Sequence, residues 1–414
     1  MNVNRPPLRE KILAGFLAGA LVLSNAAHAQ GKFESEFIFE PTVESHGHVH
    51  ASCIIEEPNG ALRAVWYENG SHLPPPYFSE QHDKSDDVRI GGARRAQDAQ
   101  AWDKPFVMAD TFGISDNNPC LAVDQQNRLW LIYPTLLGAP EWSWGSGLVR
   151  YRISSNFEKP GAPMWDKQEI LVPHVLGLKK LMEGLVDQAI AKGQLTAEQA
   201  DARKSRLEQR SKANPLIERL GWMPRAHPLV RSDGALVVPL SNENFNIACM
   251  AITKDGGETW TFSSPVPEAG LTQPTLVELP GGMIVAFFRN GGGSHRIKRS
   301  ESKDGGLTWA PVTLTDRLHP GAGIEARMLK NGHLALIYND TEKERDKLAV
   351  SISSDNGETW RWTRHLENTP KERFDYPSII QSKDGSLHVT YSYNLKTVKH
   401  AHFDEAWVQE GDSK

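Results

Sequence analysis

Three copies of one short motif recur in the second half of the chain. The copies, TKDGGETW at 253–260, SKDGGLTW at 302–309 and SSDNGETW at 353–360, share the pattern Ser/Thr-x-Asp-x-Gly-x-Thr-Trp, and their tryptophans follow at steps of 49 and 51 residues. Aspartate and glycine favour a tight turn, hydroxyl groups satisfy backbone groups there, and tryptophan packs on a sheet. The motif therefore predicts a hairpin turn repeated at about the length of one propeller blade.

A second, weaker repeat consists of an apolar strand, a turn and another apolar strand. Six such units occur, at 53–67, 120–134, 228–241, 274–290, 327–340 and 377–393. Their turn residues are spaced by 67, 107, 48, 50 and 53 positions, and they are Gly60, Asn127, Gly234, Gly282, Gly332 and Gly385. Six sheet units at this period predict an all-β fold, a six-bladed β-propeller. A β-sandwich with coincidental turns is the alternative, and three near-identical motifs disfavour it.

The single long step of 107 residues is explained by a segment of different character. From about residue 175 to 213 the sequence has helical periodicity and good helix formers. Thr196, with Glu198 and Gln199 after it, is suited to cap a second helix. We therefore expect a helical insertion at about 175–213, inside a propeller domain that spans residues 30–414.

The first 29 residues have the pattern of a secretory signal peptide. A basic segment, MNVNRPPLREK, precedes the apolar run ILAGFLAGALVLSNA, and Ala27-His28-Ala29 fits a small-x-small cleavage site. The apolar run is too short for a good membrane anchor. We expect a secreted or periplasmic protein that begins at Gln30 and is not integrated in the membrane after cleavage.

Composition and charge exclude some classes of partner. The formal net charge is −5 and the pI is about 6.3, so the chain lacks the basic footprint of a nucleic-acid-binding protein. The three cysteines, Cys53, Cys120 and Cys249, are too few and too widely spaced for a disulfide framework, and we expect them to be buried in strands. The glycine-rich stretch at 291–300 lacks the strand–helix context of a phosphate loop. No cofactor is expected, and the oligomeric state stays open.

The three motifs resemble the Asp-box, or bacterial neuraminidase repeat, of the sialidase superfamily. The resemblance covers the chain from about His46 to Trp407. Asp-boxes lie on outer hairpins, away from the propeller axis, so they indicate the fold more than the function. The chemistry is expected at the axis, where the innermost strand of each blade begins.

The residue at the start of the first strand of each unit is expected to point at the mouth of the propeller. All six of these residues are polar or ionisable, whereas Gly, Ser or Asp would be ordinary at strand starts. The six residues are His50, Asn118, His227, Gln273, Glu325 and Tyr376. Such a ring favours a carbohydrate-binding site.

The resemblance also implies roles for particular residues. Sialidases hold the sialate carboxylate with three arginines, attack with a tyrosine that a glutamate activates, and use an aspartate as acid and base. Tyr376 in DYPSII resembles the nucleophile, and Arg289 in VAFFRN resembles the second arginine. Asp86 or Asp87 falls near the acid/base position, of which we choose Asp87, and Arg327 is the candidate for the third arginine.

Two positions depart from the sialidase pattern. The first arginine normally lies in an Arg-Ile-Pro motif that opens the first blade, but here the sequence reads His50-Ala51-Ser52. The glutamate that would activate the tyrosine falls near Gln273, which cannot take a proton. Histidine is a general acid or base near neutral pH, which arginine is not, so His50 becomes a catalytic candidate.

Further polar and aromatic residues have two interpretations each. Arg225 and His227 in MPRAHPLV would pair with an acidic sugar, or be a surface arginine and a turn histidine. Glu243 in SNENFN would bond sugar hydroxyls, or cap a loop. Trp142 and Trp144 in EWSWGSG would stack on sugar rings, or pack against the inserted helices.

Three functions remain open, in order of preference. The first is an exported carbohydrate-active enzyme, a glycoside hydrolase acting on a glycan with an acidic sugar such as a uronate or sialate. Its catalytic residues would be Tyr376, Asp87 and His50, with Arg289 and Arg225 holding the anion and Gln273 and Glu325 positioning the ring. The second is a polysaccharide lyase, for which His50, Tyr376 and Arg289 would supply a base, an acid and a cation. The third is a glycan-binding propeller without catalysis.

Metal binding is a weaker interpretation of the histidine cluster. His46, His48 and His50 alternate on a strand and so share one face. A lone His-x-His pattern is a weak metal motif, and we expect hydrogen-bonding or catalytic roles and no metal site.

Overall fold

The computed structural model describes residues 31–41, 47–70, 83–138, 144–175, 177–225, 227–291 and 293–412, together with Met1. The expected signal peptide, His46 and Trp142 lie outside the described residues. The fold below concerns the unit that begins at Gly31.

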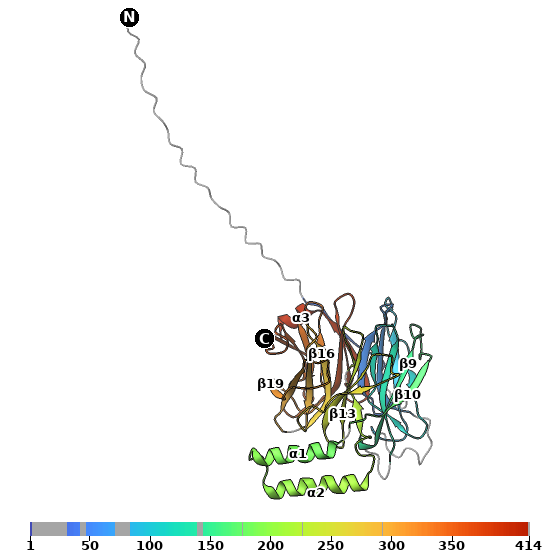
Figure 1. Cartoon of the computed structure of the whole chain (residues 1–414). Helices are drawn as coiled ribbons and strands as arrows, with labels where there is room; N and C mark the ends of the chain where they lie inside the picture. The colour runs from blue at the N-terminus through green and yellow to red at the C-terminus, as the bar shows by residue number, and fades with distance from the viewer. Residues whose placement is uncertain are drawn as a thin grey trace. The chain divides into compact units, whose positions relative to one another are not determined.

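Six antiparallel sheets form the blades of a β-propeller (Figure 1). Blade 1 consists of β2 (His50–Glu56), β3 (Leu62–Asn69), β4 (Val88–Arg95) and β5 (Phe106–Ala109). Blade 2 consists of β6 (Ser115–Asp116) with β7 (Cys120–Val123), β8 (Leu129–Leu136), β9 (Gly147–Ser154) and β10 (Lys167–Leu171). Blade 3 consists of β11 (Trp222–Pro224) with β12 (Leu229–Val230), β13 (Leu236–Asn242), β14 (Ile247–Thr253) and β15 (Thr261–Phe262).

Blades 4 to 6 follow the same order. They are β16 (Leu271–Glu278), β17 (Ile284–Asn290), β18 (Arg296–Ser302) and β19 (Thr313–Leu318); β20 (Glu325–Met328), β21 (Leu334–Asn339), β22 (Lys347–Ser353) and β23 (Trp362–Asn368); and β24 (Phe374–Gln381), β25 (Leu387–Tyr393), β26 (Thr397–Phe403) and β1 (Phe33–Phe37). The first strand, β1, completes the last blade, with Phe33 opposite Phe403. This pairing closes the ring between the two ends of the domain.

The first strand of each blade faces the axis. Strands β2, β7, β12, β16, β20 and β24 contact one another in a closed circle. The expected six hairpins all form, and their six turn residues all have positive φ, from 55° at Asn127 to 97° at Gly385. The six-bladed architecture expected from the repeat is therefore confirmed.

The Asp-box turns connect the third and fourth strands of blades 3, 4 and 5, far out on each blade. In the first, the Asp255 carboxylate accepts bonds from the Thr253 hydroxyl at 2.8 Å and the Thr259 amide at 3.0 Å. The box tryptophan of blade 5, Trp360, lies edge-on to Phe287 of blade 4, with 5.9 Å between ring centroids. The boxes thus fix a turn and pack one blade against the next.

The innermost strands are kinked close to where they start. The register with the second strand shifts between His50 and Cys53, and again in blades 4 and 6. The backbone adopts positive φ at Ala51, Asn118, Gln273 and Tyr376. A bulge re-aims side chains and non-glycine residues are strained at positive φ, so such features gather at functional sites. In this chain they turn side chains from different blades toward one mouth of the axis.

The helical insertion forms a two-helix hairpin, as expected. Helices α1 (Leu178–Ala191) and α2 (Ala197–Ala213) lie side by side at one end of the propeller (Figure 1). Thr196 and Gln199 form the capping box of α2. Leu178 and Val186 of α1 join the apolar core between blades 2 and 3. A short C-terminal helix, α3 (Glu405–Glu410), was not predicted.

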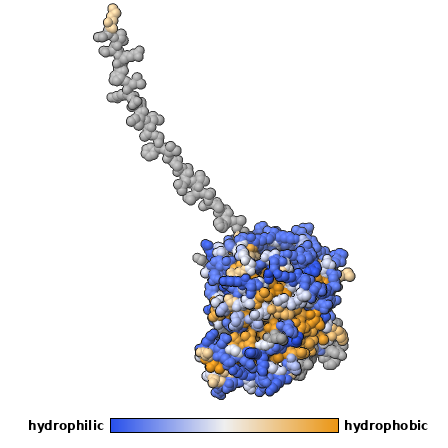
Figure 2. Space-filling model, viewed as in Figure 1, coloured by the Kyte–Doolittle hydropathy of each residue, from blue (hydrophilic) through white to orange (hydrophobic). Residues whose placement is uncertain are grey.

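The surface and the cysteines agree with a water-exposed domain built around an apolar core. In Figure 2, hydrophilic residues cover much of the face shown, and apolar residues gather near its middle. Cys53, Cys120 and Cys249 are buried and unpaired, as expected. Among the described residues, no helix has the length and apolar character needed to cross a bilayer.

Candidate active site

The starts of the innermost strands surround a cavity of about 280 Å³, called the axial pocket here. It is lined by His50, Tyr67, Asp83, Asn118, Trp144, Glu243, Gln273, Arg289, Arg345, Arg373 and Tyr376. Seven of these eleven residues were candidates from the sequence: His50, Asn118, Trp144, Glu243, Gln273, Arg289 and Tyr376. The structure therefore brings these seven residues together from five blades, although they lie up to 326 positions apart in the chain.

The Tyr376 hydroxyl is the centre of a short hydrogen-bond network. Its oxygen accepts a bond from Arg289 Nη1 at 2.8 Å and another from Gln273 Nε2 at 3.1 Å. Arg289 Nη1 also donates to Gln273 Oε1 at 3.1 Å. A phenol oxygen has two lone pairs and one hydrogen, and both lone pairs are engaged here. The phenolic hydrogen must then point in a third direction, away from both donors.

The Tyr376 ring is held between a histidine and a buried arginine. The His50 ring lies edge-on to it, with 4.3 Å between centroids. The Arg225 guanidinium is 5.1 Å from the ring centroid, fully buried, and donates to the Pro377 carbonyl at 2.8 Å. The expectation that Arg225 holds a substrate anion at the mouth is wrong, because the residue lies behind the tyrosine and does not line the axial pocket.

Two further arginines line the axial pocket, and both are held by the same buried carboxylate. Arg345 and Arg373 both donate to Asp375, whose side chain is fully buried. Burial alone would raise the pKa of Asp375, but its electrostatic interaction with the His50 ring and the charges of Arg345 and Arg373 outweigh burial and lower the pKa. Asp375 therefore stays ionised and fixes the two guanidinium groups.

The third arginine was expected at Arg327, but the structure places Arg327 outside the axial pocket, which Arg345 and Arg373 line. Arg327 lines a separate cavity of about 370 Å³, together with Glu56, Glu278 and Gln381. Those residues come from the ends of the innermost strands, whereas the axial pocket is formed by their starts. Arg327 thus lies at the opposite mouth of the axis, while Arg345 and Arg289 both line the axial pocket.

Two carboxyl groups line the axial pocket, Asp83 and Glu243. Asp87, the expected acid/base, is buried outside it and accepts bonds from Asn69 Nδ2 at 2.9 Å and the Ser85 hydroxyl at 2.8 Å. The carboxyl on this loop that does reach the pocket is Asp83. Burial raises the pKa of Glu243, with the Arg289 charge opposing it. A group of this kind keeps a proton to higher pH than an exposed glutamate does.

His50 lines the axial pocket beside Tyr376, as its place at the start of the first blade predicted. Burial lowers its pKa well below the usual value, although the Asp375 charge acts in the opposite sense. At neutral pH the imidazole is uncharged, so it cannot replace an arginine as a cation. Its Nδ1 atom is buried and has no hydrogen-bond partner among the described residues.

His227 and Glu325 form a buried pair deeper on the axis, and neither lines the axial pocket. His227 Nδ1 lies 2.6 Å from a Glu325 oxygen, and His227 Nε2 lies 2.7 Å from the carbonyl of Ile54. Glu325 also accepts from the His227 amide and the Ile379 amide, both at 2.8 Å. The pair joins four blades across the axis. Both were expected to contact substrate, and the structure instead gives them a bracing position.

The ionisation of this pair follows from its contacts. Burial alone would lower the pKa of His227, but Cys53 and Glu325 beside it raise the pKa to about 10. Burial would likewise raise the pKa of Glu325, and His227 lowers it to about 2. An imidazolium donating from both nitrogens, to a carboxylate and to a carbonyl, agrees with these directions.

Four residues of the axial pocket were missing from the sequence-based set. Asp83 lies in a segment that had been singled out, near Asp87, and Arg373 is three residues before Tyr376. Arg345 lies in the charged turn between β21 and β22, and Tyr67 near the end of β3. Nothing in those two stretches distinguishes a pocket residue from an ordinary surface or core residue. In the described ranges, no three His, Cys, Asp or Glu side chains are grouped to hold a metal ion.

Comparison with known proteins agrees with this architecture. The family model of a BNR repeat-like domain matches residues 201–389. A sialidase from Paraclostridium sordellii is 31% identical over 124 residues, 27% of this chain and 30% of that protein. A sialidase from Clostridium perfringens is 29% identical over 150 residues, 32% of this chain and 39% of that protein. The matched segments thus span less than half of these curated relatives.

Solved structures show the same fold at low sequence identity. The NanB sialidase from Streptococcus pneumoniae superposes with a TM-score of 0.65 at 11% identity, over 90% of this chain and 71% of that one. The intramolecular trans-sialidase from Ruminococcus gnavus gives a TM-score of 0.65 at 12% identity, over 90% of this chain and 98% of that one. With its Asp-boxes, its six blades and these partial matches, the chain resembles the sialidase superfamily of BNR-repeat propellers.

Proposed function

We propose that the chain is a carbohydrate-active enzyme that hydrolyses a glycosidic bond next to an acidic sugar. One observation carries the proposal: the Tyr376 hydroxyl, held by Arg289 and Gln273, opens into a pocket that also contains Arg345, Arg373 and carboxyl groups. A tyrosine held beside several guanidinium groups suits a substrate that presents a carboxylate next to its reacting carbon. The sialidase relatives, which share part of the sequence, support the same class of reaction.

The arginines would bind the carboxylate of the sugar and set its orientation. Arg345 and Arg373 are held by the buried Asp375, so their guanidinium groups are already ordered before substrate arrives. Preorganised cations cost little reorganisation when charge develops in the transition state. Arg289 would contribute both to the carboxylate and to the tyrosine oxygen.

The bond changes would occur between Tyr376, the anomeric carbon and Asp83. The tyrosine oxygen bonds to the anomeric carbon while the bond to the leaving oxygen breaks, and Asp83 gives that oxygen its proton. Water then replaces the tyrosine oxygen and returns a proton to Asp83. This two-step course retains the configuration at the anomeric carbon.

The proton of Tyr376 needs an acceptor other than Gln273. An amide cannot take a proton as a carboxylate does, and Gln273 donates to the tyrosine oxygen. The other carboxyl of the axial pocket is Glu243, which would accept the proton and return it when the tyrosine is released. This assignment is specific to this chain, because it follows from glutamine occupying the place at which the sialidase pattern has a glutamate.

A second candidate, elimination across a uronate, is favoured by the same substitution. Elimination needs a neutral base, an acid for the leaving oxygen, and donors that neutralise the carboxylate. His50 is held uncharged by burial, and it lies against Tyr376. Gln273 and Arg289 would then bind the carboxylate rather than activate a nucleophile.

The test is incubation with a panel of glycans that end in sialate or uronate, read by mass and by ultraviolet absorbance. Hydrolysis adds one water to the products, and elimination leaves an absorbing double bond. The Tyr376→Phe variant should lose turnover by about 10²-fold or more while keeping the ring packed against His50. The matched control is Asp304→Ala on a distant Asp-box turn, which should retain turnover.

Two results would overturn the proposal. Saturable glycan binding with no product would leave a glycan-binding propeller, and undiminished turnover in Tyr376→Phe would remove the tyrosine from the chemistry.

The N-terminal leader adds a separate proposal that the protein is exported. Detection of a mature form beginning at Gln30 outside the cytoplasm would support it.

A further inference from the structure

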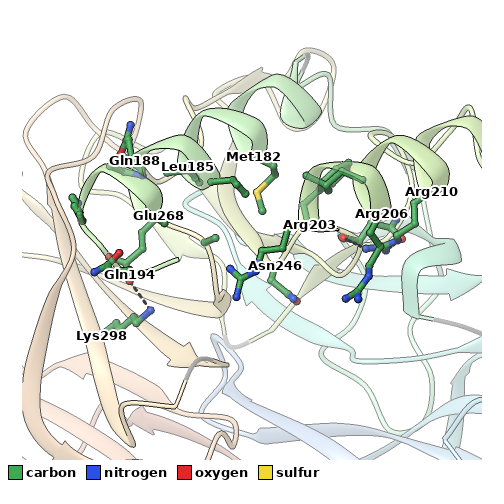
Figure 3. A pocket seen from close by; sticks show the side chains of 18 residues that line it. Met182, Leu185, Gln188, Gln194, Arg203, Arg206, Arg210, Asn246, Glu268 and Lys298 are labelled. Atoms are coloured by element: carbon green, nitrogen blue, oxygen red, sulfur yellow. Dashed lines mark hydrogen bonds and ion pairs between the residues drawn. The ribbon is translucent and has the colours of Figure 1, made fainter. Parts of the chain in front are cut away.

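A second cavity lies between the helical hairpin and the propeller. It measures about 820 Å³, against about 280 Å³ for the axial pocket, and is called the helical groove here. Figure 3 shows Met182, Leu185 and Gln188 on one wall and Arg203, Arg206 and Arg210 on α2. The propeller contributes the segments around Asn246, Glu268 and Lys298. The groove exists because the chain inserts two helices between blades 2 and 3.

The lining of the helical groove is strongly basic. It carries five cationic side chains and a single carboxylate; they are Lys192, Arg203, Arg206, Arg210, Lys298 and Glu268. The groove therefore has an excess of four positive charges, in a chain whose formal net charge is −5. Such a local reversal of sign attracts anions to one part of the surface.

Three of these cations are not used by the fold: Lys192 after α1, and Arg203 and Arg206 on α2. Lys298 is paired with Glu268 at 2.5 Å, and Arg210 donates to the Asn244 carbonyl at 2.8 Å. Arg203 and Arg206 make no ion pair or side-chain hydrogen bond within the described part of the chain. They lie three residues apart on α2, on the same face, and in Figure 3 they extend toward the loop that carries Asn246.

The helical groove adjoins the axial pocket through one turn of blade 3. Glu243 lines the axial pocket, and Asn244 and Asn246, in the same turn, line the groove. Asn244 Nδ2 donates to the Gly145 carbonyl at 2.9 Å, next to Trp144 of the axial pocket. On blade 4, Lys298 of the groove pairs in register with Phe288, the neighbour of Arg289. The two cavities are therefore lined by neighbouring residues of the same turn and of the same strand pair.

We propose that the helical groove binds the continuation of an anionic glycan whose terminal acidic sugar occupies the axial pocket. Arg203 and Arg206 would bind carboxylate or sulfate groups on the sugars that follow, since guanidinium groups match both anions with paired hydrogen bonds. Met182, Leu185 and Phe245 supply apolar surface for the C–H faces of the sugar rings. The assignment rests on the proposed function for the terminal sugar, and it adds a requirement for chain length and for repeated negative charge.

The test is calorimetric titration of the full chain with oligosaccharides of two lengths. The probes are di- and octasaccharides of galacturonate, the same lengths derived from heparin, and neutral maltooctaose. The acidic octasaccharide of at least one series should bind about tenfold or more tightly than its disaccharide. The series with the larger gain identifies the anion as carboxylate or sulfate, and neutral maltooctaose should show no comparable binding.

Two double variants distinguish binding by the arginines of the helical groove from non-specific attraction by the positive charge of α2. Arg203→Ala/Arg206→Ala should abolish the length-dependent gain and leave disaccharide affinity unchanged. Lys204→Ala/Lys212→Ala removes the same charge from α2 outside the groove lining and should keep the gain. Alanine is the best helix former, so both variants retain α2, and circular dichroism verifies this.

The variant Arg289→Ala distinguishes failure of the groove from failure of the axial pocket. If it weakens both lengths while the groove variant weakens only the octasaccharide, the proposal holds. If octasaccharide binding depends on Arg203 and Arg206 but not on Arg289, the groove is an isolated anion site, and its continuity with the axial sugar is refuted. Equal binding in the two double variants, binding of maltooctaose as tight as that of the acidic probes, or no binding of either acidic series would overturn the proposal.

Discussion

Replacing Glu325 by alanine should destabilise the propeller more than any change in the axial pocket. The carboxylate accepts three buried hydrogen bonds, from His227 Nδ1 at 2.6 Å and from the amides of His227 and Ile379 at 2.8 Å. Truncation leaves an imidazolium and two amide groups buried without an acceptor. Removing one member of a buried ion pair costs about 3–5 kcal/mol, and we expect a loss of that size in the free energy of unfolding.

The measurement is urea unfolding followed by tryptophan fluorescence, for the wild type, Glu325→Ala and Glu325→Gln. Glutamine keeps the shape and one carbonyl oxygen, but its amide group then faces the Ile379 amide, so its loss should be intermediate. A loss below about 1 kcal/mol in Glu325→Ala, the worth of one ordinary hydrogen bond, would refute the bracing role of the pair. Equal losses in the two variants would show that the charge accounts for the whole contribution, whereas no loss in Glu325→Gln would show that the charge contributes nothing.

The difference in free energy of unfolding between wild type and Glu325→Ala should depend on pH, because the pKa values of Glu325 and His227 are shifted. The pKa of Glu325 is lowered from 4.5 to about 2, so its contribution is complete above pH 4.5 and is lost as the pH falls toward 2. The pKa of His227 is raised from 6.5 to about 10, so its contribution is complete below pH 6.5 and is lost as the pH rises toward 10. The gap between wild type and Glu325→Ala should therefore be widest between pH 4.5 and 6.5. A gap that kept growing above pH 7 would contradict a charged His227.

Three further predictions concern the axial pocket and the blade rims. Asp83→Asn should lower turnover about 10²–10⁴-fold with stability retained, whereas Asp87→Asn should lower the melting temperature and retain most activity; the opposite pattern would restore Asp87 as the acid/base. Gln273→Glu should preserve or raise hydrolysis, because a carboxylate then faces Tyr376, but should abolish an elimination that needs the amide on the substrate carboxylate. Asp304→Ala should lower the free energy of unfolding by about 1 kcal/mol, since solvent replaces part of the lost turn bonds, and should leave the Michaelis constant unchanged; a folded variant without activity would show that the turn is not only structural.

The fold could be predicted because its signals are local and repeated. Each hairpin has a turn residue that tolerates positive φ, from Gly60 to Gly385, between two apolar runs. Thr196 and Gln199 identified the start of α2 in the same local manner. The strand–turn–strand pattern occurs six times, so it can be recognised without knowledge of long-range contacts.

The axial pocket could be predicted only in part, because side-chain direction depends on the kinks of the innermost strands. Strand starts identified His50, Asn118, Gln273 and Tyr376 correctly. The same rule failed at Glu325, which lies deeper on the axis and accepts from the amide of Ile379. A register rule treats all blades as equivalent. In this structure, however, Glu325 and His227 pair with each other across the axis and therefore do not line the mouth.

Loop residues were beyond such a rule. Asp83 and Arg345 reach the axial pocket from segments outside the innermost strands, and their direction depends on how those segments fold back. Arg345 is fixed by Asp375, a partner 30 positions away. Arg225 was misplaced for a related reason: it immediately follows β11, and its guanidinium turns behind Tyr376 instead of toward solvent.

The kinked starts of the innermost strands have a consequence for how such a protein changes over evolutionary time. At Asn118, Gln273 and Tyr376 the same strained backbone presents three chemically different side chains to one cavity. The conformation is imposed by the surrounding sheet, so it does not depend on which side chain is presented. Substituting a single presented residue can therefore exchange one reaction for another without rebuilding a blade. In a propeller of this kind the side chains at the mouth can be exchanged while the backbone is kept. A glutamine or a histidine at such a position is the sort of exchange by which a new substrate is acquired.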